Sequence, residues 1–179
     1  GRGCWLGQSC SPRDSAVVTR RRPINLRSME LSGLTNDLHK FPRWEGKVDG
    51  AVDLAAVATI IAPIDGALAV LFIRRADSDG DPWSGHMAFP GGRVEPSDVD
   101  VEATVCREVR EEIGLNLLAH GLRQGALSDV VTPPVGARLV VTPFVYELSE
   151  VPALTLDEQE VAAVHWLALD RLLSGEGRG

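Results

Sequence analysis

The sequence predicts a mixed α/β sandwich, and three observations carry that prediction. Apolar, β-branched runs of strand length occur both before and after one strong helical pattern near residues 101–113. Strands that flank a single amphipathic helix are typical of a sheet covered by helices. The length of 179 residues and the apolar content of 44% suit one globular domain with a sizeable core.

The first strands are expected as a hairpin. Residues 51–62 form a small, β-branched apolar run typical of a buried strand, and residues 67–75 return as its partner. The stretch from Pro63 to Gly66 between them has turn composition. A polar loop is then expected over residues 76–89, ending at a Gly-Gly turn. Further elements are expected beyond the helix: strands at 121–131, 137–148 and 160–169, and a final helix from about Asp170.

Residues 1–28 differ from the rest of the chain in charge. They carry six arginines and one acid, a net +5, so the remaining 151 residues carry −12 of the total of −7. We interpret this segment as a disordered or non-native leader before a domain of residues 29–179; an organellar transit peptide is the alternative. The ending "RLLSGEGRG" begins a helix and passes into Gly-rich coil, so we expect the domain to be truncated there.

The charge and composition exclude several classes of function. An acidic body is a poor general binder of nucleic acid, and no apolar run approaches the length of a membrane span. The three cysteines, Cys4, Cys10 and Cys106, lack metal-binding spacing, and their sparse, odd number favours a reducing compartment. We therefore expect a cytoplasmic protein without nucleic-acid or membrane partners; its oligomeric state stays open.

The central helix is expected to bury one apolar face. At about 100° per residue, that face carries Val101, Val105, Cys106, Val109 and Ile113. Asp98 or Asp100 can cap the start of the helix, and Gly114 can cap its end in the left-handed conformation.

Three glutamates, Glu108, Glu111 and Glu112, crowd the C-terminal end of this helix. Mutual repulsion and the helix macrodipole both disfavour negative charge there. A hard divalent cation would reverse both penalties, so we predict carboxylate ligands for Mg²⁺ or Mn²⁺. The alternative is a solvated acidic face paired with Arg107 and Arg110.

The helix and the residues before it resemble the Nudix box. That pattern is a glycine, five residues, an acid, seven residues, and Arg-Glu-apolar-x-Glu-Glu-x-Gly-apolar; here Gly92 opens it and "REVREEIGL", residues 107–115, closes it. The acid is Asp98, and eight residues follow it, which resembles the coenzyme A pyrophosphatase branch. "FPGG", residues 89–92, also resembles that branch, whereas its serine is replaced by Ala76 and its basic residue by "DSDGD".

The resemblance covers roughly Val52 to Leu173 and implies an α/β/α sandwich with a mixed β-sheet. It further implies hydrolysis of a nucleoside diphosphate linked to another group, with Mg²⁺ or Mn²⁺ as cofactor. The residues that it implies as metal ligands and catalytic groups are Glu108, Glu111 and Glu112, with Arg107 orienting a glutamate. Gly91 and Gly92 would let the backbone pass close to the site. The general base stays open among Glu108, Glu112, Asp157, Glu158 and Glu160.

The partner implied is a small nucleotide-containing substrate, with coenzyme A or an acyl-CoA first. The alternatives are ADP-ribose or a nucleoside diphosphate sugar, and a non-catalytic nucleotide-binding module. Arg74, Arg75 and Arg93 are candidates for phosphate contacts because a guanidinium binds phosphate oxygens bidentately. Trp83 can stack on an adenine or plug its own loop.

Overall fold

The computed structural model describes residues 43–46, 52–132 and 138–175. The expected leader at 1–28, the rest of the chain before Arg43, the loop at Pro133 and Pro134, and the expected truncation after Gly175 lie outside these ranges. In the described part of the chain, no helix is long and apolar enough to cross a membrane.

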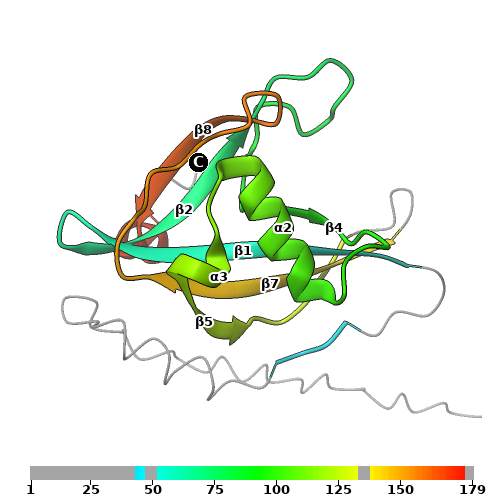
Figure 1. Ribbon diagram of the computed structural model, residues 1–179, viewed down its shortest axis with the longest axis horizontal. Helices are drawn as coiled ribbons and strands as arrows, with labels where there is room; N and C mark the ends of the chain where they lie inside the picture. Colours follow the sequence, from blue (N-terminus) through cyan, green and yellow to red (C-terminus); the bar gives the residue numbers. More distant parts are fainter. Residues whose placement is uncertain (1–42, 47–51, 133–137, 176–179) are drawn as a thin grey trace, which may run out of the picture.

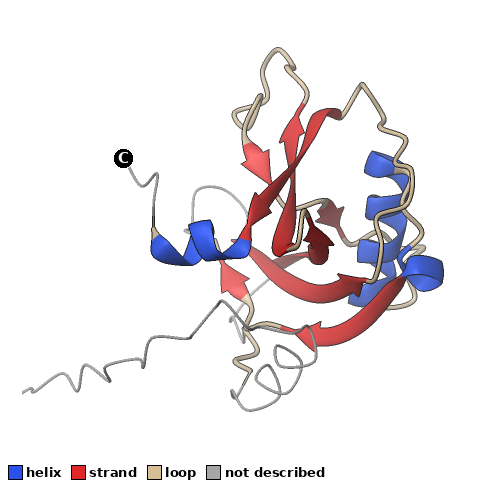
Figure 2. Cartoon of the chain, turned by 90° about the vertical axis from the view of Figure 1, so that its left-hand side faces the viewer, coloured by secondary structure: helices blue, strands red, loops and turns tan. Residues whose placement is uncertain are grey.

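One mixed sheet forms the centre of the described chain, with helices on both faces (Figures 1 and 2). The elements are β1 (Val52–Ile64), β2 (Ala67–Arg75), β3 (Met87–Ala88), β4 (Gly91–Arg93), α2 (Val101–Ile113), α3 (Leu117–His120), β5 (Gly121–Ala126), β6 (Val130–Val131), β7 (Arg138–Leu148), β8 (Val161–Ala168) and α4 (Leu169–Ser174). The strand order is β3-β2-β1-β7-β5, with β4 on β1, β6 on β7 and β8 on β2. Only the β1–β7 pair is parallel among these, so the predicted mixed α/β sandwich is confirmed.

The period of two along the strands divides the core between the two faces. Ile60 and Tyr146 belong to the main core, which α2 completes with Val105, Val109 and Ile113. The next residues along the same strands, Ile61 and Val145, face the other way and belong to a smaller cluster with two leucines of α4. Figure 2 shows α2 and α4 on opposite sides of the twisted sheet.

The predicted hairpin is confirmed, with its turn at Asp65 and Gly66. Both residues have positive φ, 51° and 79°, the geometry that joins two antiparallel strands with the right twist. The predicted Gly-Gly turn is wrong, because Gly91 and Gly92 lie in β4 and pair with β1. The expected strand at 121–131 is broken into β5 and β6, with an irregular register between Arg123 and Gly125. The short helix α3 was not expected.

Candidate active site

Helix α2 begins and ends as its sequence predicts. The Asp100 carboxylate accepts a hydrogen bond from the Ala103 N–H at 2.7 Å, which makes Asp100 the N-cap of the two candidates. Gly114 ends the helix with φ 69°, and its N–H donates to the carbonyl of Arg110. These two ends fix the helix along the sheet, where it lies across β1 and β7 (Figure 1).

The carboxylates of Glu108 and Glu112 lie against the backbone of strand β4. The Gly91 N–H donates to Glu112 Oε2 at 2.8 Å, and Glu112 is only 2% exposed. A Cβ atom on Gly92 would stand 2.2 Å from Glu108 Oε1. At Gly91, φ is 143° and a Cβ atom would stand 2.2 Å from the carbonyl oxygen of Ala56. Gly91 therefore requires glycine for the pairing with β1, whereas a side chain at Gly92 would displace the Glu108 carboxylate.

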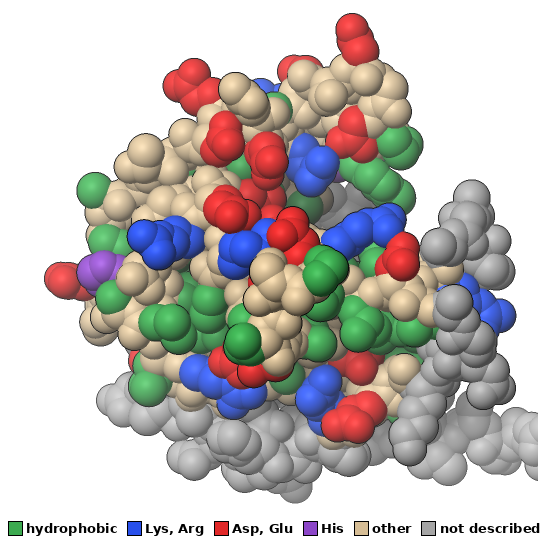
Figure 3. All heavy atoms as spheres, turned by 45° about the vertical axis from the view of Figure 1, so that its right-hand side comes forward, with side chains coloured by type: hydrophobic (Ala, Val, Ile, Leu, Met, Phe, Trp, Pro, Cys, Tyr) green, Lys and Arg blue, Asp and Glu red, His purple; other side chains and the backbone are tan. Residues whose placement is uncertain are grey.

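The two carboxylates carry more negative charge than their surroundings compensate. Burial raises the pKa of Glu112 to about 8. The hydrogen bond from Gly91 lowers this pKa, whereas the charges of Glu108 and Glu160 raise it. Burial also raises the pKa of Glu108, although Arg107 opposes this. Glu160, a candidate base from the turn before β8, raises the pKa of both carboxylates through its charge. Figure 3 shows acidic and basic side chains crowded together on the upper part of one face.

Arg107 joins the loop before α2 to the glutamates. Its Nε and Nη2 donate to Asp98 at 3.0 and 3.1 Å, and Thr104 Oγ1 donates to the same carboxylate at 2.8 Å. This guanidinium holds the pKa of the Asp98 carboxyl far below its ordinary value. Arg107 Nη1 also donates to Glu108 at 2.9 Å and to Glu111 at 3.1 Å. The arginine therefore positions two glutamates from one anchor.

The sequence pattern identifies Asp98 as a candidate residue of the site but does not identify its partner Thr104. The spacing of the box indicates a role for Asp98, and helix capping is the other role that its position allows. Thr104 is fully buried and was not singled out. A hydroxyl placed inside an apolar helix face was the signal that could have found it, because such a group needs a partner.

The other predicted residues are not all brought to β4. Glu111 has a side chain that is 59% exposed and turned to Arg107. Arg93 follows Gly92 in the strand, so its side chain leaves on the opposite face, where it pairs with Asp53. Arg74 forms an ion pair with the exposed Asp77 in the loop after β2, and Arg75 bonds Asp81 there.

Trp83 lies on the same loop and is 62% exposed. Its ring meets that of His86 edge-on, with 5.8 Å between the centroids. This exposed position differs from that of a side chain plugging its loop.

The donor set around β4 suits a hard divalent cation. Glu108 and Glu112 present carboxylate oxygens that are shielded from water and that repel one another, which a cation would reverse. Across the described ranges, no three His, Cys, Asp or Glu side chains are grouped closely enough to hold a metal ion. Arg107 donates to Glu111, the third candidate ligand, as it does to Glu108. The residues fit the ion in chemistry, and a three-carboxylate site would need Glu111 to leave Arg107.

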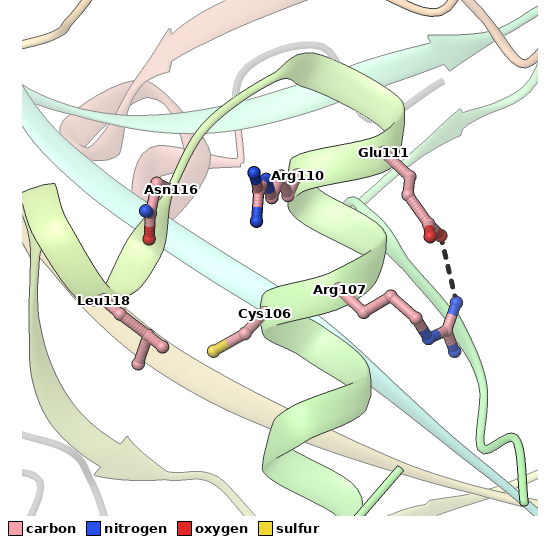
Figure 4. Close-up of a pocket in the computed structure, with 6 residues that line it drawn as sticks. All are labelled: Cys106, Arg107, Arg110, Glu111, Asn116 and Leu118. Carbon is pink, nitrogen blue, oxygen red and sulfur yellow. Dashed lines mark hydrogen bonds and ion pairs between the residues drawn. The ribbon is translucent and has the colours of Figure 1, made fainter. Parts of the chain in front are cut away.

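A hollow of about 510 Å³ lies on the outer side of α2, next to α3 (Figure 4). Its lining is Cys106, Arg107, Arg110, Glu111, Asn116 and Leu118. Neither β4 nor Glu108 or Glu112 contributes to it, so it adjoins the carboxylate centre only through Arg107 and Glu111. Figure 4 shows Arg107 and Glu111 joined to one another and directed away from Cys106 and Leu118.

Residues 53–178 match the family model of the NUDIX domain. The chain belongs to the Nudix family. The matched range includes both glycines of β4, the three candidate ligands Glu108, Glu111 and Glu112 of α2, and Glu160. The Nudix resemblance of the sequence is thereby confirmed over nearly the whole described domain.

Two relatives of this Nudix chain carry names that state a substrate. It is 32% identical over 125 residues to the human mitochondrial coenzyme A diphosphatase NUDT8, which covers 70% of this chain and 52% of that protein. It is 33% identical over 109 residues to the mouse peroxisomal coenzyme A diphosphatase NUDT7, covering 60% and 44%. These relatives support the assignment to the coenzyme A pyrophosphatase-like branch. The chain spans about half the length of each of them.

Solved structures share the Nudix fold at lower identity. The Nudix domain of Shewanella oneidensis NrtR, crystallised with ADP-ribose, superposes with a TM-score of 0.57 at 22% identity. The match covers 82% of this chain and 88% of that one. At this identity the likeness establishes the α/β/α sandwich alone.

Proposed function

We propose that this protein hydrolyses the pyrophosphate bond of a nucleoside diphosphate linked to another group, in a reaction that depends on Mg²⁺ or Mn²⁺. The observation that carries the proposal is the pair of carboxylates held against the backbone of Gly91 and Gly92, Glu112 buried and Glu108 partly buried. Arg107 compensates part of the charge of Glu108, whereas Glu112 is buried without an ion-pair partner of its own among the described residues. A buried acid of this kind weakens the fold, so a charge-neutralising ligand explains its burial.

The residues divide the work of such a reaction. Glu108 and Glu112, with Glu111 if it turns from Arg107, would hold a divalent cation. When bound, the cation would neutralise the phosphate oxygens and lower the pKa of the attacking water. A carboxylate then accepts a proton of that water as its oxygen attacks phosphorus, and the bond to the bridging oxygen breaks. Glu160 is our first candidate for this base, because its charge acts on both Glu108 and Glu112 while its own side chain stays exposed.

Coenzyme A or an acyl-CoA is the first candidate substrate, supported by the two relatives that are named coenzyme A diphosphatases. ADP-ribose or a nucleoside diphosphate sugar is the second candidate. The observation favouring it is the loop after β2, which carries Asp77, Asp79 and Asp81. A basic residue there would neutralise the 3′-phosphate of coenzyme A, and ADP-ribose has no such phosphate. A nucleotide-binding module without catalysis is the third reading, and the retained glutamates weigh against it.

A substrate panel with one metal concentration tests the proposal. Coenzyme A, acetyl-CoA, dephospho-CoA and ADP-ribose are incubated with the protein, and phosphate-terminated products are separated by chromatography. We expect hydrolysis that Glu112→Gln abolishes and that Glu150→Gln, an exposed acid far along the chain, leaves intact. Binding of these compounds without product formation would move the protein to the binding module.

The same proposal includes a cytoplasmic location. The two named relatives are mitochondrial and peroxisomal proteins, so imaging of the full chain with a C-terminal fluorescent tag is the direct test. Fluorescence confined to an organelle would contradict it.

A further inference from the structure

Arg75 lies at the neck of the loop that follows β2. Its N–H donates to the carbonyl of His86 at 3.0 Å, and the N–H of Ala76 donates to the carbonyl of Glu160 at 2.8 Å. The backbone of Arg75 is thereby fixed between the loop and the turn that carries Glu160. The positive charge of Arg75 also acts on Glu112, where it lowers the pKa that burial raises.

The guanidinium of Arg75 uses only part of its hydrogen-bonding capacity. Nη2 donates to Asp81 Oδ2 at 2.9 Å. Nε is shielded from solvent and has no hydrogen-bond partner among the described residues. A buried N–H without an acceptor costs free energy, and a phosphate oxygen is an acceptor of the right charge.

Asp81 is itself held in place. Its Oδ1 accepts from the Trp83 N–H at 2.9 Å, and this hydrogen bond, followed by Arg75, keeps the pKa of Asp81 below its ordinary value. Asp77 in the same loop gives a contrast, because its side chain is 80% exposed and stands 3.7 Å from Arg74. Asp81 is therefore a fixed anchor, whereas Asp77 is a solvated surface acid.

We propose that Asp81 is a positioning residue that holds Arg75 so that its remaining N–H groups bind a phosphate oxygen of the substrate. This inference rests on the proposed function, since it requires a diphosphate lying between Arg75 and the glutamates. A guanidinium fixed at one edge loses little conformational freedom when its other edge binds an anion. An acid of the segment "DSDGD", which replaces the basic residue of the related signature, thus acts through an arginine.

Asp81→Asn tests the role of Asp81 with a small change. The asparagine keeps an oxygen for the Trp83 N–H and removes the charge that holds Arg75. Asp77→Asn is the matched control, with the same charge change in the same loop. Binding of α,β-methylene-ADP, a non-hydrolysable nucleoside diphosphate, is measured by calorimetry with Mg²⁺, together with kcat and KM on the best substrate of the panel.

We expect Asp81→Asn to weaken probe binding and raise KM by about threefold to tenfold, with kcat changed less than about twofold, as for loss of a supporting charged hydrogen bond. Arg75→Gln should weaken binding by about tenfold to a hundredfold. Asp77→Asn should bind like the wild type. In the Arg75→Gln background, Asp81→Asn should have no further effect, because an acid that acts through Arg75 has nothing left to position.

Additive effects of Asp81→Asn and Arg75→Gln would overturn the inference, as would equal effects of Asp81→Asn and Asp77→Asn. Probe binding does not depend on turnover, so the two proposals fail separately. Arg75-dependent binding without hydrolysis of any panel member would end the hydrolase proposal and support this one. Hydrolysis of a panel member, together with wild-type binding of the probe by Arg75→Gln, would support the hydrolase proposal and end this one.

Discussion

Glu112→Gln should stabilise the metal-free protein at alkaline pH while removing its activity. Glu112 is buried against β4, and its folded pKa of about 8 stands above the ordinary value of 4.5. A group whose pKa rises on folding contributes most stability below its unfolded pKa, and that contribution is lost as the pH rises toward the folded pKa. Between pH 4.5 and pH 8 the unfolded chain ionises Glu112 while the folded chain keeps it protonated, so stability falls increasingly over this range.

The magnitude follows from these two values. At about 1.4 kcal/mol per pKa unit, the carboxylate costs roughly 4 kcal/mol of folding free energy at pH 8 and about 1 kcal/mol at pH 5. Glutamine has a similar volume and can still accept from the Gly91 N–H, but its amide donors lack a partner, which costs about 1–3 kcal/mol. The net gain at pH 8 is then about 1–3 kcal/mol, or several degrees in Tm for a chain of this length. At pH 5 the gain disappears or reverses.

Thermal unfolding in EDTA at pH 5 and pH 8 measures this difference. Glu111→Gln is the matched control, because Glu111 lies on the same helix with an exposed side chain and should show no comparable dependence on pH. Saturating Mg²⁺ should raise the Tm of the wild type more than that of Glu112→Gln. A Glu112→Gln protein that melts well below the wild type in EDTA at pH 8 would refute the reasoning and make Glu112 a structural partner of Gly91.

Three further results are expected. Hydrolysis of the best panel substrate should stop in EDTA and return with Mg²⁺ or Mn²⁺, and turnover that survives exhaustive chelation would contradict a metal requirement. Gly92→Ala should fold but lose activity by about a hundredfold or more, because the methyl group displaces only the Glu108 carboxylate. Gly91→Ala should lose stability by several kcal/mol, because its methyl group meets the backbone of β1. Activity assays and urea unfolding separate these outcomes, and equal stability of the two variants would count against the geometry. Asp98→Asn should cost about 1–3 kcal/mol in urea unfolding at pH 7, since it breaks the bonds to Arg107. The pKa of Asp98 is lowered on folding, so this cost should shrink as the pH falls below about 3.8, and a cost independent of pH would point to packing instead.

Local spacing was enough to predict the hairpin and several features of helix α2. The period of the helix identified its buried face, the left-handed end at Gly114 and the common direction of Glu108 and Glu112, because residues four apart on a helix lie one above the other. The hairpin at Asp65 and Gly66 was equally local. These features depend on residues within a few positions of one another, and so the sequence determined them by itself.

Only the tertiary structure decided which of those residues meet. Gly92 accommodates Glu108 because β4 pairs with β1 under α2, and a shift of one residue in that register would present Arg93 instead. Glu160 comes near the glutamates because β8 pairs with β2, about ninety positions earlier in the chain, next to an irregularity between Arg74 and Arg75. At this same end of β2, Arg75 donates to Asp81 of the following loop. Sheet register and strand ends bring together residues that are far apart in sequence, and no local pattern records that pairing.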